Sequence, residues 1–137
     1  SDYVEEALAF ARMNSDLNGL HEEKTDFRIL DWENPTEREP FSLVLGAEVV
    51  YDYFFHGSLQ IVLDRMLDQH GRIMLADRKR LCVSRFMGRM IDRGFACEET
   101  SSHVKIEGFP DQEVTIFTLQ RANTTERDRL YRSDSVR

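Results

Sequence analysis

The run FSLVLGAEV, residues 41–49, constrains the fold more than any other stretch of the chain. Its apolar residues are nearly continuous rather than alternating, which is typical of a strand covered on both faces. Such strands occur in sheets that carry helices on both sides, so we expect an α/β sandwich. The run reaches an acid, Glu48, and Tyr51 follows three positions later. This is either an ordinary strand end or the edge of an active site.

Helices and further strands are expected to alternate around this run. Apolar residues at helical spacing predict helices at 3–17, 57–71 and 81–94, with stop signals at Asn18-Gly19, Gly71 and Gly94. Short runs rich in strand formers predict strands at 26–30, 72–76, 95–109 and 113–119. This order favours a mostly parallel sheet with an antiparallel closing hairpin at one edge.

Length and charge limit the classes of function. The chain has 137 residues, the size of one domain, and its formal net charge of −7 argues against a nucleic-acid binder. No apolar stretch approaches the roughly 20 residues of a membrane span, so we expect no membrane partner. Two cysteines without a CxxC pattern favour a reducing, cytoplasmic setting. The four histidines are scattered, so no metal site is predicted.

Polar residues follow three of the expected strands. Ligands of open α/β sheets bind beyond the carboxyl ends of the strands. The pair Asp31-Trp32, the segment from Glu48 to Tyr51, and Asp77 therefore fall on one rim. This convergence favours an active site over an ordinary strand end.

The motifs and their order resemble the class I, seven-strand S-adenosylmethionine-dependent methyltransferases with a Rossmann-like fold, and most closely the protein-lysine methyltransferase-like branch. Ser1-Asp2-Tyr3 before EEALAFARMN resembles the end of the family's second strand and its helix. Leu30-Asp31-Trp32 resembles the end of the third strand, and LVLGAEVVYD resembles the fourth-strand motif. The segment GRIMLADRKR, its following helix and the final VTIFTL resemble the rest of the fold. The resemblance covers residues 1–120 as a partial methyltransferase domain, followed by a charged tail at 121–137.

The resemblance implies a transferase that uses S-adenosylmethionine, with a protein or another amine as the methyl acceptor. It implies catalytic roles for Glu48 and Tyr51, and cofactor-binding roles for Asp2, Asp31, Trp32 and Ala47. Two of the acids also have a simpler interpretation: Asp2 as a helix N-cap and Glu48 as a solvated strand end. Trp32 could be a core aromatic residue.

Three further features of the sequence carry open alternatives. Residues 78–80, Arg-Lys-Arg, could grip an acidic protein substrate, although a solvated loop is preferred. His56 could accept a proton near the site, although a surface histidine is commoner. Cys82 and Cys97 are expected to be small buried residues.

The sequence departs from the family pattern in two ways. The family's fourth-strand acid is usually Asp, and here it is Glu48. The chain contains no GxG, so the family's first strand and its glycine-rich loop are not recognisable. We therefore expect a missing N-terminal segment or a partner chain to complete the sheet. The alternatives are a sheet in which segment 26–30 pairs directly with 41–49, and a non-catalytic, methyltransferase-like interaction module.

Overall fold

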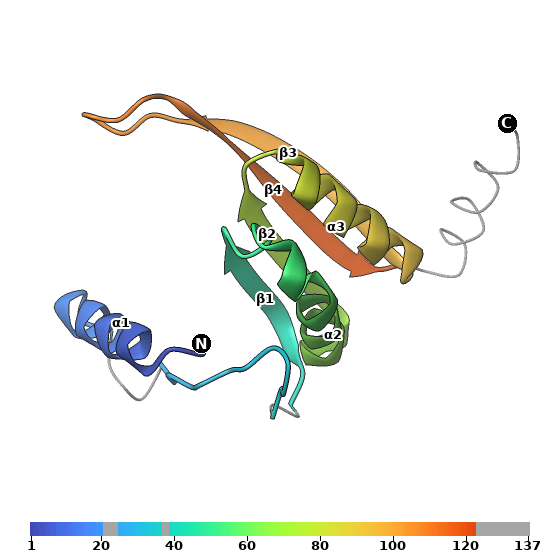
Figure 1. The fold of residues 1–137 in the computed structure, drawn as a ribbon. Coiled ribbons are helices and arrows are strands. Elements are labelled where there is room, and N and C mark those ends of the chain that lie inside the picture. Colours follow the sequence, from blue (N-terminus) through green and yellow to red (C-terminus); the bar gives the residue numbers. More distant parts are fainter. Residues whose placement is uncertain (21–24, 37–38, 123–137) are drawn as a thin grey trace, which may run out of the picture. The chain divides into compact units, whose positions relative to one another are not determined.

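The computed structural model describes residues 1–20, 25–36 and 39–122, and the chain forms two compact units. The first unit spans residues 1–38 and the second spans residues 39–137. Figure 1 shows the helices and strands of both units along the chain. Each unit is described by itself.

The first unit consists of helix α1 (Glu5–Leu17) and an extended segment near residue 29. Two acids in the first turn, Glu5 and Glu6, stabilise the helix by interacting with the positive end of its dipole. The helix ends at the predicted stop, where Gly19 adopts a positive φ of 66°. Residue Asp2 forms one isolated parallel bridge with Ile29.

Two predictions for the first unit need correction. The strand predicted at 26–30 is a single bridge, because its one described partner is the short segment at Asp2. The buried stripe predicted for the helix is also incomplete: Leu8 is buried, but Leu17 is 82% exposed. Helical spacing predicted the helix correctly, but it did not predict which of the apolar side chains are buried.

The second unit contains one four-stranded sheet in the order β1-β2-β4-β3. Strands β1 and β2 are parallel, whereas β4 runs antiparallel to both β2 and β3. The α/β fold and its antiparallel closing hairpin are thus confirmed. The sheet was predicted to be mostly parallel, whereas the four described strands form a mixed sheet with one parallel and two antiparallel pairings. The elements are β1 (Phe41–Ala47), η2 (Tyr53–Phe55), α2 (His56–Met66), β2 (Leu67–Asp77), α3 (Leu81–Asp92), β3 (Phe95–Val104) and β4 (Gln112–Arg121).

The boundary between α2 and β2 differs from the prediction. The helix ends at Met66, and Leu67 to Gly71 belong to the strand, so the prediction of helix up to Gly71 is wrong. Gly71 has a different role, because a Cβ there would lie 2.9 Å from the carbonyl oxygen of Phe41. This glycine allows the backbones of β1 and β2 to approach closely, beside a register shift between Phe41 and Leu43.

The two faces of the sheet are buried to different extents. Helices α2 and α3 lie over the sheet and contact it (Figure 1). Register places six residues on the covered face, and all are almost fully buried: Ile73, Leu75, Asp77, Thr115, Phe117 and Leu119. On the opposite face, Leu43 and Leu45 of β1 are 48% and 68% exposed. We call this the open face; it also carries Met74, Ala76 and Ile116.

Strand β1 is an edge of the described sheet, because its hydrogen-bonded neighbour there is β2 alone. The amide of Glu48 donates to the carbonyl of Ala76 at 2.9 Å. Because backbone groups alternate along a strand, Leu43, Leu45 and Ala47 direct theirs away from β2. In the described part of the chain, one edge of β1 is therefore unpaired.

The chain beyond β4 is described only as far as residue 122. Arg121, the first residue of the predicted tail, belongs to β4 and bonds to Asp64 at 2.6 Å. Residues 123–137 of that tail lie outside the described part, so the tail stays a prediction. Among the described helices, none is long and apolar enough to cross a membrane.

Candidate active site

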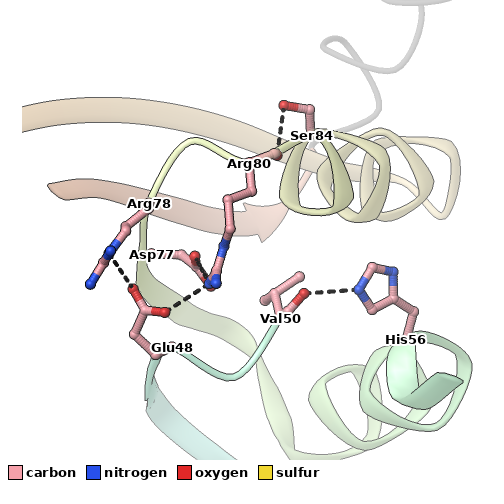
Figure 2. Close-up of polar contacts among 7 residues, drawn as sticks. All are labelled: Glu48, Val50, His56, Asp77, Arg78, Arg80 and Ser84. Carbon is pink, nitrogen blue, oxygen red and sulfur yellow. Dashed lines mark hydrogen bonds and ion pairs between the residues drawn. The ribbon is translucent and has the colours of Figure 1, made fainter. Parts of the chain in front are cut away.

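The carboxyl ends of β1 and β2 form the candidate site. The two strands are parallel, and Ala47 pairs with Ala76 in register. Glu48 follows β1 and Asp77 ends β2, so their side chains lie on neighbouring positions of one rim (Figure 2). The structure therefore brings together two of the acids that the sequence placed there.

Glu48 has an unusual backbone conformation. It is the one non-glycine residue of the described chain with a positive φ, at 53°. This left-handed conformation costs roughly 1 kcal/mol for a residue with a Cβ, and it is found most often at turns and functional sites. The conformation ends β1 and turns the chain toward Val50, which is fully buried.

A guanidinium group joins the two acids. Arg80 Nη2 donates to Glu48 Oε2 at 2.7 Å and also forms a very short contact with Asp77 Oδ1 (Figure 2). Arg78 Nε lies 3.8 Å from Glu48 Oε1. Two cations thus surround the Glu48 carboxylate, and one of them is held by Asp77.

The members of this network differ in exposure. The side chain of Asp77 is 1% exposed, whereas those of Arg80 and Glu48 are 38% and 50% exposed. The hydrogen bond from Arg80 to Asp77 raises the pKa of Arg80 above its ordinary value. Within the described part of the chain, Asp77 Oδ2 and Arg80 Nε are buried without a hydrogen-bond partner. Arg80 therefore spans from a buried acid to one that solvent and ligands can reach.

His56 stabilises the chain just after Glu48. Its Nε2 lies 3.0 Å from the carbonyl oxygen of Val50, and the ring is 1% exposed. The ring also packs edge-on against Phe86, with centroids 5.1 Å apart. The interpretation of His56 as a surface residue is therefore wrong, because the start of α2 carries it into the core.

Tyr51 lies on the accessible side of the same segment, 64% exposed. Asp52 then accepts a hydrogen bond from the Phe54 amide at 2.9 Å, which starts the short helix η2. Phe54, three positions after Tyr51, is 90% exposed. The side chain of Tyr51 is thus accessible to solvent. Ala47, also exposed, is the last residue of β1.

The remaining predicted cofactor residues belong to the first unit. Asp2 Oδ1 accepts from the Val4 amide at 3.0 Å, although the N-cap of α1 is Val4 itself. The Leu30 amide donates to the Asp2 carbonyl at 2.9 Å, so Asp2 lies beside the segment that ends at Asp31. These contacts bring Asp2 and the Asp31-Trp32 pair to one end of the unit.

Asp31 is held by a local turn. Its two carboxylate oxygens accept from the Glu33 amide at 2.8 Å and from the Asn34 side chain at 3.1 Å. The hydrogen bond from Asn34, followed by that from Glu33, lowers the pKa of Asp31. These hydrogen bonds therefore favour the ionised carboxylate at the end of the extended segment. Trp32 beside it is half-buried.

Comparison with known proteins identifies the family. A family model described as lysine methyltransferase matches residues 1–93, which include every one of these residues. The chain belongs to the lysine methyltransferase family. No curated protein matches its sequence.

Solved structures share the fold. Precorrin-6y C5,15-methyltransferase from Geobacter metallireducens GS-15 aligns with a TM-score of 0.67 and 16% identity over 87% of this chain and 64% of its own. A ribosomal protein L11 methylase from Lactobacillus delbrueckii subsp. bulgaricus aligns with a TM-score of 0.65 and 14% identity over 89% of this chain and 56% of its own. The chain thus spans less than two thirds of these two structures. At such identities the likeness shows the methyltransferase fold.

The network at the rim contains partners that the sequence interpretation missed. Residues 78–80 form an exposed loop, as expected, but their side chains are paired: Arg78 and Arg80 bind Glu48, and Lys79 Nζ lies 2.9 Å from Glu99 Oε2. Three basic residues directly after an acid that ends a buried strand are a usable signal for such pairing. In the described part of the chain, no group of three or more His, Cys, Asp and Glu side chains could hold a metal.

Proposed function

We propose that this lysine methyltransferase family member transfers a methyl group from S-adenosylmethionine to an amine of a protein side chain. The observation that carries the proposal is the position of Glu48, an accessible carboxylate held by Arg80 at the end of β1, within the region that matches the family. The bound cofactor would supply an electrophilic methyl group on a sulfonium.

In this proposal Glu48 and Tyr51 orient the acceptor amine. A lysine amine must be neutral and aligned before it can attack a methyl group, and alignment contributes most of the rate gain. The Glu48 carboxylate accepts a hydrogen bond from the amine, and the exposed hydroxyl of Tyr51 offers a second contact. Arg80 keeps the Glu48 carboxylate in place through its bond to the buried Asp77.

The first unit suits the cofactor's nucleoside. Carboxylates accept hydrogen bonds from hydroxyl groups, and Asp2 and Asp31 lie at the ends of neighbouring extended segments. In the proposal Asp2 binds the ribose hydroxyls, while Asp31 and the half-buried Trp32 contact the adenine. Ala47 lies at the end of β1, where a small residue leaves room for a ligand.

We also propose that further polypeptide pairs with β1 and completes the cofactor site. The support is the unpaired edge of β1, the exposure of Leu45 at 68% on the open face, and the lack of any GxG sequence. In this proposal either another segment or a partner chain supplies the added strand and the glycine-rich loop that approaches the cofactor. The chain by itself would then bind the cofactor weakly.

The test measures methyl transfer by the complete protein. Tritium from methyl-labelled S-adenosylmethionine is followed into a library of lysine peptides, and mass spectrometry locates the methyl group. We expect Glu48→Gln to lower kcat about 100-fold or more, because the alignment of the amine is lost. We expect Glu48→Asp to keep measurable activity, because Asp is the acid that the family usually has at this position.

Matched variants separate this effect from a general loss of charge. Glu98→Gln makes the same change at an exposed acid on β3 and is expected to leave kcat unchanged. Full activity of Glu48→Gln would contradict the role of Glu48. Cofactor binding by calorimetry without transfer to any peptide or protein amine would instead support the non-catalytic interaction module.

A further inference from the structure

The hairpin formed by β3 and β4 extends beyond the rest of the sheet. Pairing of β2 with β4 ends at Asp77 and Thr115, whereas β3 and β4 stay paired as far as Val104 and Gln112. We call residues 102–114 the hairpin arm. Figure 1 shows the arm projecting past the arrowheads of β1 and β2. Because β4 is antiparallel to β2, the arm lies on the carboxyl side of β2, which is the side of the candidate site.

The tip of the arm carries an apolar hollow. The Phe109 amide donates to the Ile106 carbonyl at 3.0 Å, and Gly108 has a φ of 82°, so a tight turn brings these residues together. The hollow has a volume of about 210 Å³. Ile106 and Phe109 are 57% and 67% exposed. The lining is Val104, Ile106, Phe109, Pro110, Gln112 and Val114.

The charge around the hollow is negative. Between residues 104 and 114 there are three acids, Glu107, Asp111 and Glu113, and one base, Lys105, which gives a net charge of −2. Exposed apolar side chains surrounded by charge are typical of a protein-interaction surface. An acidic rim favours a basic partner and repels nucleic acid and anionic lipid.

Two contacts fix the base of the arm beside the site. Lys79 Nζ, from the segment that holds Glu48, lies 2.9 Å from Glu99 on β3, and this hydrogen bond raises the pKa of Lys79. The hydroxyl of Ser101 lies 2.9 Å from that of Thr115, the residue paired with Asp77. These contacts hold the base of the arm next to the carboxyl end of β2, where Glu48 and Asp77 lie.

We propose that the hairpin arm docks a basic segment of the protein substrate, with one apolar side chain of that segment in the hollow at the tip. This rests on the proposed function and adds a substrate-recognition site to it. Thr115 and Gln112 are three positions apart along β4, which is about 10 Å at roughly 3.4 Å per residue. An extended segment spanning about 10–20 Å from rim to tip has roughly three to six residues between the methylated lysine and its apolar anchor.

The first experiment measures peptide binding by fluorescence anisotropy with the complete protein. The probes are three labelled peptides of equal length: lysines with one leucine, the same peptide with serine for leucine, and the leucine peptide with glutamates for lysines. We expect the first to bind most tightly. Ile106→Ser and Phe109→Ser are each expected to weaken the affinity for this first peptide about tenfold, because an apolar contact is lost.

A matched control is available on α3. Ile91→Ser makes the same change at an isoleucine that is 37% exposed, and it is expected to change the affinity less than twofold. Glu113→Gln tests the charge without altering the apolar surface, and we expect it to weaken binding and reduce its salt dependence. Unchanged affinity in the Ile106, Phe109 and Glu113 variants would overturn the proposal. Tighter binding of the glutamate peptide, of DNA or of phosphatidylserine vesicles would also overturn it.

The second experiment keeps docking and chemistry apart. In methyl transfer to peptides with different lysine-to-leucine spacings, tip variants should raise KM several-fold and leave kcat unchanged, whereas Glu48→Gln should lower kcat. Equal KM for the parent and the tip variants at every spacing would refute docking while leaving the proposed function intact. Peptide binding without transfer would refute the proposed function while leaving the arm as a docking surface.

Discussion

The two faces of the sheet differ although the same strands form both. On the covered face, Ile73, Leu75 and Phe117 are at most 1% exposed beneath α2 and α3. On the open face, Leu43 and Leu45 present apolar side chains of the same kind at 48% and 68% exposure. Apolar residues on both faces are what a strand buried on both sides requires. The comparison indicates that β1 has the composition of a central strand and the exposure of an edge strand.

The acids at the carboxyl ends of β1 and β2 also differ in burial. Asp77 lies on the covered face and holds Arg80, while Glu48 remains half-exposed at the end of the edge strand. The buried half of the network is fixed by the core of the second unit. In the function that we propose, the accessible half is the part that contacts the substrate amine.

The largest expected difference between the faces comes from truncating one leucine on each. Leu75→Ala leaves a cavity in the core and should lower the free energy of unfolding by about 2–5 kcal/mol. Leu45→Ala should change it by less than about 0.5 kcal/mol, because the side chain is already solvated. Chemical denaturation followed by circular dichroism measures both. Equal losses would show that the open face is covered in solution.

The next effect concerns the buried acid. Asp77→Ala removes the buried one of the two acids that bind Arg80 and should lower the free energy of unfolding by about 1–3 kcal/mol. Lys79→Ala breaks only an exposed ion pair with Glu99 and should be less destabilising. Both variants are compared by denaturation at one pH and one salt concentration. A larger loss of stability in Lys79→Ala than in Asp77→Ala would contradict the expectation that the bond between Arg80 and the buried Asp77 is the more stabilising contact.

A smaller effect is expected on self-association. An unpaired apolar edge favours contact with other chains, and lysine on an edge opposes it. Leu45→Lys should therefore decrease the weight-average mass in sedimentation velocity at high protein concentration, without a change in stability. Ile61→Lys on α2, an exposed isoleucine in a helix, provides the matched control. An equal decrease in both variants would attribute association to general hydrophobicity rather than to β1.

The smallest effect concerns a thiol on the covered face. Cys97 pairs with Leu119, and its burial, followed by the charges of Glu99 and Glu98, raises its pKa from 9.0 to about 11. Below pH 9 the thiol is protonated in both the folded and unfolded states, and its contribution to stability is lost as pH rises from 9 through 11. In a Cys82→Ser variant, alkylation by iodoacetamide should accelerate toward pH 11. A plateau near pH 9 would show that Cys97 is solvated.

Local patterns in the sequence predicted much of the fold. The strand within the run at 41–49, the helix α3 and the hairpin of β3 and β4 all depend on near neighbours, and all three are confirmed. The cover expected on both faces of the first strand is found on one face of the described sheet. The end of α2 could not be predicted in this way. Gly71 resembles a helix stop, but its close approach to the Phe41 carbonyl in the neighbouring strand determines its place.

The site was predictable only in part. The acids at the strand ends follow from the parallel pairing of β1 and β2. The bond between Arg80 and Glu48 joins residues 32 positions apart, so no local pattern contains it. The positive φ of Glu48 is also a consequence of how β1 ends against β2, since glutamate has no preference for that conformation.

Amide hydrogen exchange in β1, followed by NMR, tests the central claim that this strand is an unpaired edge of the sheet, with which we propose that further polypeptide pairs. We predict slow exchange for Val44, Gly46 and Glu48, whose amides face β2. We predict exchange close to the unprotected rate for Leu43, Leu45 and Ala47, whose amides face away from it. Slow exchange of all six amides in the isolated chain would contradict the claim, because the edge would then already be paired.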